Sequence, residues 1–521
     1  DTVLNISDGA GACFGLQRGT EVTIRNFRLI GHTGLAEQPG VVRTSSGFNF
    51  WACALKSCNA VSINATERVL VENVHASRMA SECFFSGGPY RQGKEEPKEY
   101  TRSATFLRCS VTDCAANAFN NCDFAENTSI LYCRVDGAGA GWHAYEGSGR
   151  FVRFIGNYVR NAGPVTIGDI PHSLPRLDHF QELGVGQAIV ADNVFEGIGR
   201  CGGIRVNHCP TQVVIANNLF INYNGYAIAT SNATVHNTYP PQNISITGNI
   251  IDLTYAGENP AWRGGIIVNT SDTLVSNNQV YVRGAPDAKV TGVQIRDGAL
   301  NVNVHGNLVR NCGRGLVAHR LPGKVAEVVD SRTFLQTGLP LEWRTSHLYR
   351  NWTLAWLKDS KPAGQSVVDA YDPATLRFKL REPHEMRADD SFEAFPPSAN
   401  WNIHGNTLTG CVQPVLLDSY GSETSFFKDN VVTRSEATGV KSAIEVRGRF
   451  NLIGNHVSGF DESGCSALTL HPDRFGKPME SVYRDNVFER CANVVNESVK
   501  GLWEASNQGN TTIRCGSTAA E

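Results

Sequence analysis

The chain has 521 residues, 41% of them hydrophobic, and is long enough to bury a large core. Its formal net charge of -3 and pI of about 6.6 imply no basic surface for nucleic acid. No apolar run approaches the ~18 residues of a membrane-spanning helix, so no membrane span is expected. Because the sequence starts at Asp1 with neither an initiator methionine nor a signal peptide, we expect a mature or trimmed chain. We expect the protein to be secreted, periplasmic or on the cell surface.

A short motif of alternating residues around one Asn recurs along the chain. Its first copies are "VTIRNFRL" at 22–29 and "VLVENVHA" at 69–76, and its last copy is "SVYRDNVF" at 481–488. In "FLRCSV" and "ILYCRV", Cys109 and Cys133 take the place of the Asn. The Asn residues of the motif are Asn26, Asn73, Asn157, Asn193, Asn218, Asn249, Asn278, Asn307, Asn406, Asn430, Asn455 and Asn486.

The spacing of this motif predicts the fold. The shortest intervals are 24 or 25 residues, as between Asn406 and Asn430, and the longer ones fit the same unit with insertions. Short alternating strands in a unit of this length are typical of one coil of a parallel β-helix, since a propeller blade needs ~40 residues. The Leu-x-x-Leu-x-Leu consensus of leucine-rich repeats is missing. We therefore predict an all-β protein, a right-handed parallel β-helix of about fifteen coils and roughly 70 Å in length, with the Asn residues stacked as a ladder.

Most of the fifteen cysteines are predicted to be small core residues. Cys114, Cys312, Cys411 and Cys491 each follow a motif position by five residues, where other coils carry apolar side chains. This spacing follows the coils and places the four cysteines in an inward-facing column. Stacked neighbours such as Cys312 and Cys411 remain able to pair if oxidised.

A second short strand is predicted between one motif and the next. The aligned segments are "WHAYE", "VTIGD", "IRVNH", "AIATS", "IIVNT", "VQIRD", "LVAHR", "VLLDS", "IEVRG" and "LTLHP". Their first and third positions are mostly apolar and should face the core, so the second and fourth face outward and the fifth begins a turn. The polar residues predicted at outward and exit positions are His143, Tyr145, Glu146, Asp169, Arg205, Asn207, His208, Asn269, Gln294, Arg296, Asp297, His319, Arg320 and Asp418.

Insertions gather on both sides of this second strand. Long segments follow it at "GGPYRQGKEEPKEYTR" and "IPHSLPRLDHFQE", and others precede it at "AGENPAWRG" and "RGAPDAKVTG". Long loops on a rigid scaffold are where binding and catalytic sites commonly lie. We therefore predict a groove along this face, with the segment "GWHAYEG" (141–147) on its floor.

The largest interruption separates Asn307 from Asn406. It contains strand-like runs such as "SVVDAY" and "LRFKL" and the Trp-rich stretch "WRTSHLYRNWTLAW". The interval exceeds one coil by roughly 75 residues, which is enough for a small subdomain. We predict an inserted β subdomain at 321–398 within a β-helix formed by 1–320 and 399–521.

These coils, with their Asn ladder and loop-walled strand face, resemble the pectin-lyase-like superfamily of parallel β-helices over nearly all of the chain. The resemblance implies a carbohydrate-active protein, since the superfamily contains polysaccharide lyases, glycoside hydrolases, epimerases and phage tailspikes. The segment "LREPHEMRADDSFEAFPPSANWNIHGNTLTG" is similar to the end of the barrel insertion in β-helical α-1,3-galactosidases. Those enzymes carry an Asp-Asp pair just before the insertion, where this chain has "CGRGLVAHR", so their activity is not carried over. The paired Asp and Gly-His-Gly pattern of polygalacturonases is also missing.

A pair of carboxyl groups on the predicted groove suits glycoside hydrolysis. Such pairs are about 5 Å apart for retention or roughly 6.5–9.5 Å apart for inversion. In the aligned segments, Glu146 and Asp169 take matching positions on neighbouring coils, with backbones about 5 Å apart. Like charges at that distance raise one pKa, as a general acid requires. We predict a glycoside hydrolase with Glu146 and Asp169 as acid and base or nucleophile, supported by His143, Tyr145 and His208.

Substrate-binding residues are predicted on the same face. Arginine forks suit carboxylate and sulfate groups, so an acidic or sulfated polysaccharide is the expected substrate and partner. The alternative is that Glu146 and Asp169 form only a surface pair satisfied by Arg205 or His208. The predicted binding residues are Arg205, Asn207, Arg296, Asp297, His319 and Asp418.

Two other functions fit the sequence. A polysaccharide lyase needs a cation for a uronate and a base for its C5 proton, and the histidines, arginines and Tyr145 of this face supply both. A non-catalytic glycan-binding or tailspike-like rod would use exposed aromatic side chains, for which Trp142, Trp262 and Trp343 are candidates. The sequence contains no His-x-x-x-His or Cys-x-x-Cys pair that would indicate a metal site, and no cofactor is expected. Asp and Asn near turns could bind a structural Ca²⁺, but no motif supports this.

Overall fold

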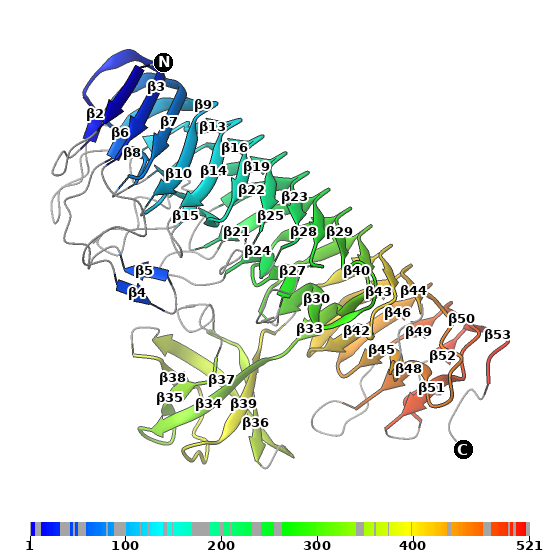
Figure 1. Ribbon diagram of the computed structural model, residues 1–521. Helices are drawn as coiled ribbons and strands as arrows, with labels where there is room; N and C mark the ends of the chain where they lie inside the picture. Colours follow the sequence, from blue (N-terminus) through cyan, green and yellow to red (C-terminus); the bar gives the residue numbers. More distant parts are fainter. Residues whose placement is uncertain are drawn as a thin grey trace. The chain divides into compact units, whose positions relative to one another are not determined.

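The computed structural model describes residues 2–5, 12–31, 42–44, 47–49, 59–79, 82–87, 100–114, 116–121, 125–138, 143–147, 149–168, 187–197, 203–207, 211–223, 225–231, 241–254, 263–296, 298–339, 349–358, 361–372, 375–397, 399–434, 439–472, 481–498, 501–503 and 507–516. In these ranges the regular secondary structure is β-strand, with no helix (Figure 1). The chain divides into two compact units. Unit 1 comprises Asp1–Ala229, Val235–Ile251 and Tyr255–Asn259, and unit 2 comprises Thr230–Thr234, Asp252–Thr254 and Pro260–Glu521.

The coils contribute strands to two parallel sheets, sheet A at the motif and sheet B between motifs. The strands of sheet A are β1 Thr2–Asn5, β3 Thr20–Ile30, β7 Glu67–Ser77, β9 Thr101–Leu107, β10 Ser110–Cys114, β12 Ala125–Glu126, β13 Ser129–Leu131, β14 Arg134–Ala138, β16 Val152–Ile155, β17 Tyr158–Arg160, β19 Ala188–Ala191, β20 Val194–Glu196, β22 Thr211–Ala216, β23 Leu219–Ile221, β25 Gln242–Thr247, β26 Ile250–Asp252, β28 Thr273–Ser276, β29 Gln279–Tyr281, β31 Asn303–His305, β32 Leu308–Arg310, β40 Asn402–His404, β41 Thr407–Thr409, β43 Gly421–Lys428, β44 Val431–Thr433, β46 Arg449–Ile453, β47 His456–Ser458, β49 Tyr483–Arg484, β50 Val487–Glu489, β52 Asn507–Gln508 and β53 Thr511–Ile513.

Sheet B has one strand from each coil, and a short hairpin lies outside both sheets. The strands of sheet B are β2 Ala12–Gln17, β6 Asn59–Asn64, β8 Phe84–Gly87, β11 Phe119–Asn121, β15 His143–Gly147, β18 Gly163–Ile167, β21 Ile204–Val206, β24 Tyr226–Thr230, β27 Arg263–Val268, β30 Asp287–Arg296, β33 Cys312–His319, β42 Gln413–Asp418, β45 Ser442–Val446, β48 Ser466–Leu470 and β51 Asn493–Glu497. The hairpin consists of β4 Val42–Thr44 and β5 Gly47–Asn49.

Each strand pairs in parallel with the equivalent strand of the next coil. In unit 1, β7 pairs with β9 and β10, and β10 pairs with β14. In unit 2, β40 pairs with β43 and β42 pairs with β45. Parallel pairing between successive turns of the chain, repeated in both sheets, makes a parallel β-helix. The predicted fold is therefore confirmed.

Aromatic side chains stack inside the coils of unit 1. Phe84 of β8 and Phe119 of β11 are in register and their rings stack with centroids 5.1 Å apart. Phe106 of β9 lies 5.5 and 5.6 Å from these two rings. Such aromatic pairs contribute about 0.5–1.5 kcal/mol each beyond the burial of their area. This stack fixes β8 beside β11, two of the three strands that carry the candidate site.

The predicted Asn ladder is present from Asn157 onward. The side-chain amide of Asn157 donates to Asn193 Oδ1 at 3.0 Å, and Asn193 donates to Asn218 Oδ1 at 2.8 Å. Asn193 Nδ2 also donates to the carbonyl of Phe154 on the preceding coil at 2.9 Å. Because these buried amides are hydrogen-bonded, they stabilise the stack without leaving polar groups unsatisfied. In unit 2 the ladder runs through Asn278, Asn307, Asn406, Asn430, Asn455, Asn486 and Asn510.

Asn26 and Asn73 lie outside the ladder, which corrects the prediction for the first two coils. The pairing of β7 with β10 places Val74 in the ladder position and Asn73 one residue before it. Asn26 and Asn73 are exposed, have φ values of 62° and 52°, and form a hydrogen bond of 2.9 Å with each other. The error of one residue arises because Asn also tolerates the left-handed conformation that precedes the ladder position.

The cysteines of the predicted inward column are buried. Cys114, Cys312, Cys411 and Cys491 are free thiols in the described part of the chain. A hydrogen bond with Cys411, together with burial, holds the pKa of the Cys312 thiol well above its usual value. These cysteines therefore act as small apolar core residues, as predicted.

The large insertion forms a closed antiparallel barrel in unit 2 (Figure 1). Its core contains Phe334, Tyr349, Trp356, Phe378 and Phe392. The strands lie within the segment 321–398, where a β subdomain is expected from the gap in the repeat. In barrel order they are β34 Leu321–Val328, β35 Thr333–Thr337, β38 Arg377–Leu380, β37 Lys361–Asp372, β36 Thr353–Lys358 and β39 Ser391–Phe395.

A buried arginine joins the barrel to the coils of unit 2. Arg320 lies between β33 and β34, and its Nη1 is 2.9 Å from Glu393 Oε2 on the barrel strand β39. Its Nε is 2.6 Å from Asp418 Oδ1 on the coil strand β42. The Tyr420 ring centroid lies 4.8 Å from the guanidinium carbon, and the Tyr420 hydroxyl donates to Glu393 at 3.1 Å. This network compensates the buried charges and fixes the barrel against its supporting coil.

Candidate active site

The register of sheet B in unit 1 decides which side chains share its outer face. Glu146 of β15 pairs with Asn120 of β11 on one side and with Thr166 of β18 on the other. Thr166 pairs in turn with Arg205 of β21. The outward row is therefore Asn120, Glu146, Thr166 and Arg205, on consecutive strands ~4.8 Å apart.

Tyr145 lies in the core, although the sequence predicts it on the outer face. It is in register with Phe119 and Val165, has no exposed surface, and its ring lies 5.9 Å from that of Phe154. In the alignment of the second strands, this segment begins three residues too early, because its small and apolar residues also fit the expected alternation. The structure pairs Tyr145 with Val165, and this register buries the Tyr145 ring. Tyr145 is therefore no base or acid for catalysis.

The same register changes the partner of Glu146. Glu146 pairs with Thr166, so Asp169 does not take the matching position on the neighbouring strand. Asp169 itself lies outside the described residues. The carboxyl group that the structure brings to Glu146 is a different one.

A carboxyl pair is held by a single amide. Asn120 Nδ2 donates to Glu82 Oε1 at 2.5 Å and to Glu146 Oε2 at 3.2 Å. Glu82 precedes β8, and the backbone N–H of Cys83 donates to the carbonyl of Asn117 at 3.0 Å. Parallel pairing of β8, β11 and β15 thus brings together carboxylates that are far apart in the sequence.

Asn117 and His143 complete the surroundings of Glu146. The Asn117 amide donates to Glu146 Oε2, and its oxygen accepts the backbone N–H of His143 at 2.9 Å. His143 Nδ1 lies 3.6 Å from Glu146 Oε1. The side chains of His143 and Glu146 are 17% and 22% exposed, so they remain accessible while they are held in place. Amide donors of this kind stabilise an ionised carboxylate.

Desolvation changes the acidity of Glu82. Desolvation raises the pKa of Glu82, and the hydrogen bonds from Asn120 and Asn117 oppose this shift without cancelling it. A carboxyl group with a raised pKa keeps its proton to higher pH and can act as a general acid.

Of the remaining predicted residues of unit 1, the structure describes Arg205 and Asn207. Arg205 is half-buried, two strands from Glu146, and has no ion-pair partner among the residues that the structure describes. Asn207 is half-buried, and its backbone N–H donates to the carbonyl of Ile167 at 2.9 Å. His208 lies outside the described residues.

Sequence reasoning missed Glu82, Asn117 and Asn120. The segments "ECFFSG" and "NAFNNC" belong to coils of sheet B that the alignment of second strands leaves out. Adding them with Phe84, Phe119 and Tyr145 as the inward position would have placed Asn120 next to Glu146. The sequence therefore contains the pattern that identifies Asn120, but recognising it requires an alignment in which Tyr145 is an inward-facing residue.

A second group of predicted residues meets on sheet B in unit 2. Arg296 of β30, His319 of β33 and Asp418 of β42 are in register on consecutive strands. Burial, with the nearby charges of Arg314 and Arg296, lowers the pKa of His319 to about 4. His319 is therefore a neutral imidazole at neutral pH, and Asp418 is paired with the buried arginine of the barrel joint. Asp297 lies outside the described residues.

A strongly bonded carboxylate lies two strands from His319. Glu445 of β45 accepts Gln413 Nε2 at 3.0 Å and Arg447 Nε at 2.8 Å, and its Oε1 is 3.3 Å from His471 Nε2. The hydrogen bond with His471, followed by that with Arg447, lowers the pKa of Glu445 to about 2. Such a carboxylate is permanently ionised and is no proton donor near neutral pH.

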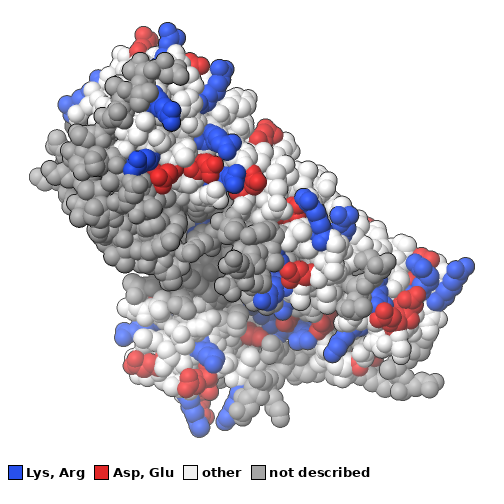
Figure 2. Space-filling model, viewed as in Figure 1, with Lys and Arg blue, Asp and Glu red and all other residues white. Residues whose placement is uncertain are grey.

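No cluster of three or more His, Cys, Asp or Glu side chains suited to a metal ion occurs within the described ranges. The part of the chain that is described also has no helix long and apolar enough to cross a bilayer. Acidic and basic side chains are interspersed over the face seen in Figure 2, with no extended field of one sign.

Comparisons with known proteins give structural similarity alone. No protein-family model matches the chain, and no curated protein does. The chain is similar to a mutant tailspike protein of E. coli bacteriophage HK620 in complex with a hexasaccharide, at 9% identity and a TM-score of 0.44 over 98% of this chain and 70% of that chain. A double mutant of that tailspike gives 8% identity and a TM-score of 0.40, over 98% and 72%. A mutant in complex with a pentasaccharide gives 10% and 0.35, over 98% and 72%.

Proposed function

We propose that the protein is a glycoside hydrolase that cleaves a polysaccharide, with Glu82 and Glu146 as its catalytic carboxyl pair. The observation that carries this proposal is the contact of one amide, that of Asn120, with both carboxyl groups. Hydrolysis of a glycosidic bond needs two carboxyl groups on either side of the scissile bond. One of them must carry a proton while the other is ionised.

The surroundings of the two groups assign these roles. Glu82 has its pKa raised by burial and serves as the general acid. Glu146 accepts hydrogen bonds from Asn117 and Asn120 and lies beside His143, which suits an ionised carboxylate. The two groups share the amides of Asn117 and Asn120, so the desolvation of Glu82 and the position of His143 beside Glu146 assign them different parts in the reaction.

The separation of the pair favours retention of configuration. Asn120 Nδ2 lies 2.5 Å from Glu82 Oε1 and 3.2 Å from Glu146 Oε2, so these oxygens are at most 5.7 Å apart, the sum of both distances. Retaining pairs are about 5–5.5 Å apart, whereas inverting pairs need roughly 6.5–9.5 Å to admit water. Glu146 therefore acts as the nucleophile.

The reaction then has two steps. Glu146 attacks the anomeric carbon while the bond to the leaving oxygen breaks, and Glu82 gives its proton to that oxygen. In the second step Glu82, now ionised, takes a proton from water, and the water oxygen displaces Glu146 from the sugar. The pair returns to its starting state with one water consumed.

Arg205 supports an acidic or sulfated substrate. It lies in the same outward row as Glu146, two strands away, or ~10 Å along the sheet. A guanidinium at that distance can bind the carboxylate or sulfate of a neighbouring sugar unit through two hydrogen bonds. Arg205→Gln should therefore weaken activity on charged polysaccharides more than on neutral ones.

A panel of acidic, sulfated and neutral polysaccharides tests the function. New reducing ends and ultraviolet absorbance are measured together in each digest. Reducing ends without new absorbance are expected, since hydrolysis forms no double bond. A parallel rise of both signals would show β-elimination by a lyase instead. Binding without new ends would show a glycan-binding protein without catalysis.

A further inference from the structure

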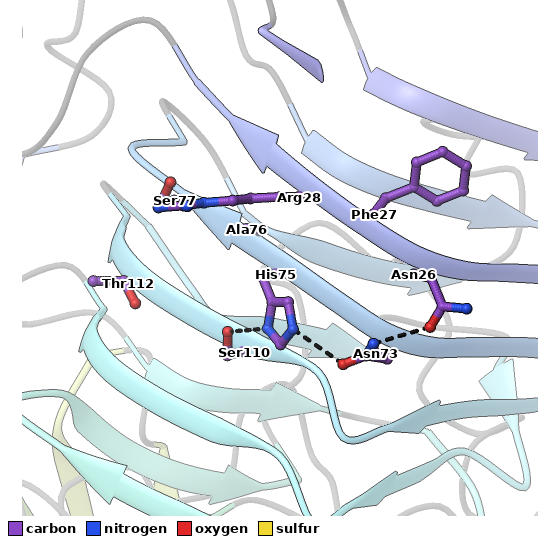
Figure 3. A pocket seen from close by; sticks show the side chains of 9 residues that line it. All are labelled: Asn26, Phe27, Arg28, Asn73, His75, Ala76, Ser77, Ser110 and Thr112. Atoms are coloured by element: carbon purple, nitrogen blue, oxygen red, sulfur yellow. Dashed lines mark hydrogen bonds between the residues drawn. The ribbon is translucent and has the colours of Figure 1, made fainter. Parts of the chain in front are cut away.

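A second polar site lies on sheet A of unit 1, on a different face from the carboxyl pair. A hollow of about 480 Å³ is lined by side chains from β3, β7 and β10 (Figure 3). Small-molecule sites have volumes of ~300–1,000 Å³. In this hollow His75 of β7 is in register with Arg28 of β3 on one side and with Ser110 of β10 on the other.

A chain of hydrogen bonds links four side chains in the hollow (Figure 3). Ser110 Oγ lies 2.8 Å from His75 Nδ1, and His75 Nε2 lies 3.0 Å from Asn73 Oδ1. Asn73 Nδ2 donates to Asn26 Oδ1 at 2.9 Å. Asn73 and Asn26 have a left-handed backbone, with φ values of 52° and 62°, and the Asn73 amide lies between the imidazole and the Asn26 amide.

The direction of these bonds fixes the tautomer of His75. Because the amide nitrogen of Asn73 donates to Asn26, its oxygen must face His75 and accept a hydrogen bond. His75 therefore carries its proton on Nε2 and presents a lone pair at Nδ1. The hydroxyl of Ser110 donates to that lone pair. This is the arrangement of a nucleophile, a general base and an orienting group.

We propose that Ser110, His75 and Asn73 form an esterase site that removes acyl groups from sugar hydroxyls. Ser110 is the nucleophile, His75 is the base, and Asn73 is a positioning residue that holds the imidazole in the required tautomer. The site is open to large substrates, since His75 is exposed and Ser110 is half-buried. It lies apart from Glu82 and Glu146, so it does not depend on glycoside hydrolysis.

Two further side chains can stabilise the oxyanion. Arg28 and Thr112 both line the hollow, and Arg28 has no ion-pair partner among the residues that the structure describes. The register places Arg28 two strands from Ser110, with His75 between them, and Thr112 lies two residues after Ser110 on β10. From these positions a long guanidinium and a hydroxyl can donate to the negative oxygen of a tetrahedral intermediate. An ester has the carbonyl that this chemistry needs, and a small acyl group fits the volume.

The reaction balances with water as its second reactant. Ser110 Oγ attacks the acyl carbon and its proton passes to His75 Nδ1. The intermediate expels the sugar oxygen, which takes that proton, and the acyl group remains on Ser110. Water then attacks the acyl group while His75 takes its proton and returns it to Ser110, so a carboxylic acid is released.

A fluorophosphonate probe and 4-nitrophenyl acetate test the proposal on the full chain. The probe should label Ser110, as located by peptide mass spectrometry, and Ser110→Ala and His75→Ala should lower kcat/KM for the acetate at least ~100-fold. Ser77→Ala is the matched control, since Ser77 lines the same hollow outside the hydrogen-bond chain and should leave both signals unchanged. Glu146→Gln should also leave both unchanged, which separates this activity from glycoside hydrolysis.

The role of Asn73 has its own readout. Asn73→Ala should lower kcat ~10-fold without changing KM, and Asn73→Asp should restore it, because a carboxylate accepts the same bond from His75 Nε2. A purely structural role would give both variants the same rate. Wild-type protein that is not labelled at Ser110, or unchanged acetate cleavage by Ser110→Ala, would overturn the proposal. The labelling result with wild-type protein stands even if a variant fails to fold.

Discussion

The chemical role of a single residue in this protein depends on its surroundings. Glu82 and Glu146 are chemically the same and both accept hydrogen bonds from Asn117 and Asn120, but desolvation raises the pKa of Glu82, whereas Glu146 lies beside His143. Tyr145 also shows this dependence. The sequence predicts its phenol as a catalytic group, but in the structure its side chain lies in the core. Chemistry is therefore assigned from contacts and burial rather than from residue type.

Replacing Glu82 with Gln should make the fold less sensitive to rising pH. Burial raises the pKa of Glu82 above its usual 4.5, so the folded chain keeps this proton to a higher pH than the unfolded chain. The stability that this provides is full below about pH 4.5 and is lost as pH rises through the folded pKa. Gln cannot ionise, so Glu82→Gln should gain in melting temperature over wild type as pH increases from 4 to 8.

Thermal unfolding curves across that range measure this effect. Glu385→Gln is the matched control, since the Glu385 side chain is 89% exposed and should show the wild-type profile. Identical pH profiles for wild type and Glu82→Gln would contradict the raised pKa of this group.

At the scale of strands and coils, the repeat predicts most of the fold. A recurring Asn, with shortest intervals of 24 or 25 residues, is a strong signal, because a buried amide must be bonded to its equivalents in the neighbouring coils. The barrel is detectable in the same way, as an interval too long for one coil. Element type and period are therefore accessible from the sequence.

The register between strands is harder to predict, and the candidate site depends on it. The contact between Asn120 and Glu82 spans 38 residues of sequence, and an insertion lies between them. An error of three residues in the frame at Tyr145 moves every side chain of that strand to a different neighbour. This is why the sequence places Glu146 at the exit of its strand with Asp169 as its partner, whereas the structure places it within the strand, in register with Asn120 and Thr166.

Replacing a ladder residue should destabilise the coils strongly. In Asn307→Ala, the backbone N–H and side-chain amide of Asn278 lose their acceptor, Asn307 Oδ1, which lies 3.0 Å from each. Buried unsatisfied donors cost ~1–3 kcal/mol each, so a loss of at least about 2 kcal/mol is expected. Asn303→Ala, in the same coil but half-buried and outside the ladder, is the control and should change stability by less than ~1 kcal/mol.

Denaturant unfolding of both variants measures the difference. An unfolding free energy for Asn307→Ala equal to that of Asn303→Ala would show that the ladder adds no stability.

At the scale of the whole molecule, the two compact units contain different candidate sites and different structural elements. Unit 1 contains the carboxyl pair and the serine site, and unit 2 contains the barrel and the row of Arg296, His319 and Asp418. The barrel is a separate hydrophobic core tied to its coils by a buried arginine. Stability of unit 2 and catalysis in unit 1 should therefore respond to different substitutions.

Removing the charge of Arg320 should weaken the attachment of the barrel to the coils of unit 2. Arg320→Gln leaves Glu393 and Asp418 without their cation, and removing one partner of a buried pair costs about 3–5 kcal/mol. Limited proteolysis should then cut the barrel segment before the coils. Lys379→Gln is the control, because its ion pair with Asp369 is exposed and contributes little. Equal cleavage rates for Arg320→Gln and Lys379→Gln would exclude a structural role for the ion pairs of Arg320.

The most direct test of the carboxyl pair is to measure the release of reducing ends from a polysaccharide that the wild type cleaves. The rates of Glu82→Gln and Glu146→Gln are compared with that of the wild type, and Glu385→Gln is the control. Both site variants should be folded and lose at least ~100-fold in kcat, while the control keeps wild-type activity. Wild-type rates of reducing-end release in either folded site variant would contradict the assignment of the carboxyl pair.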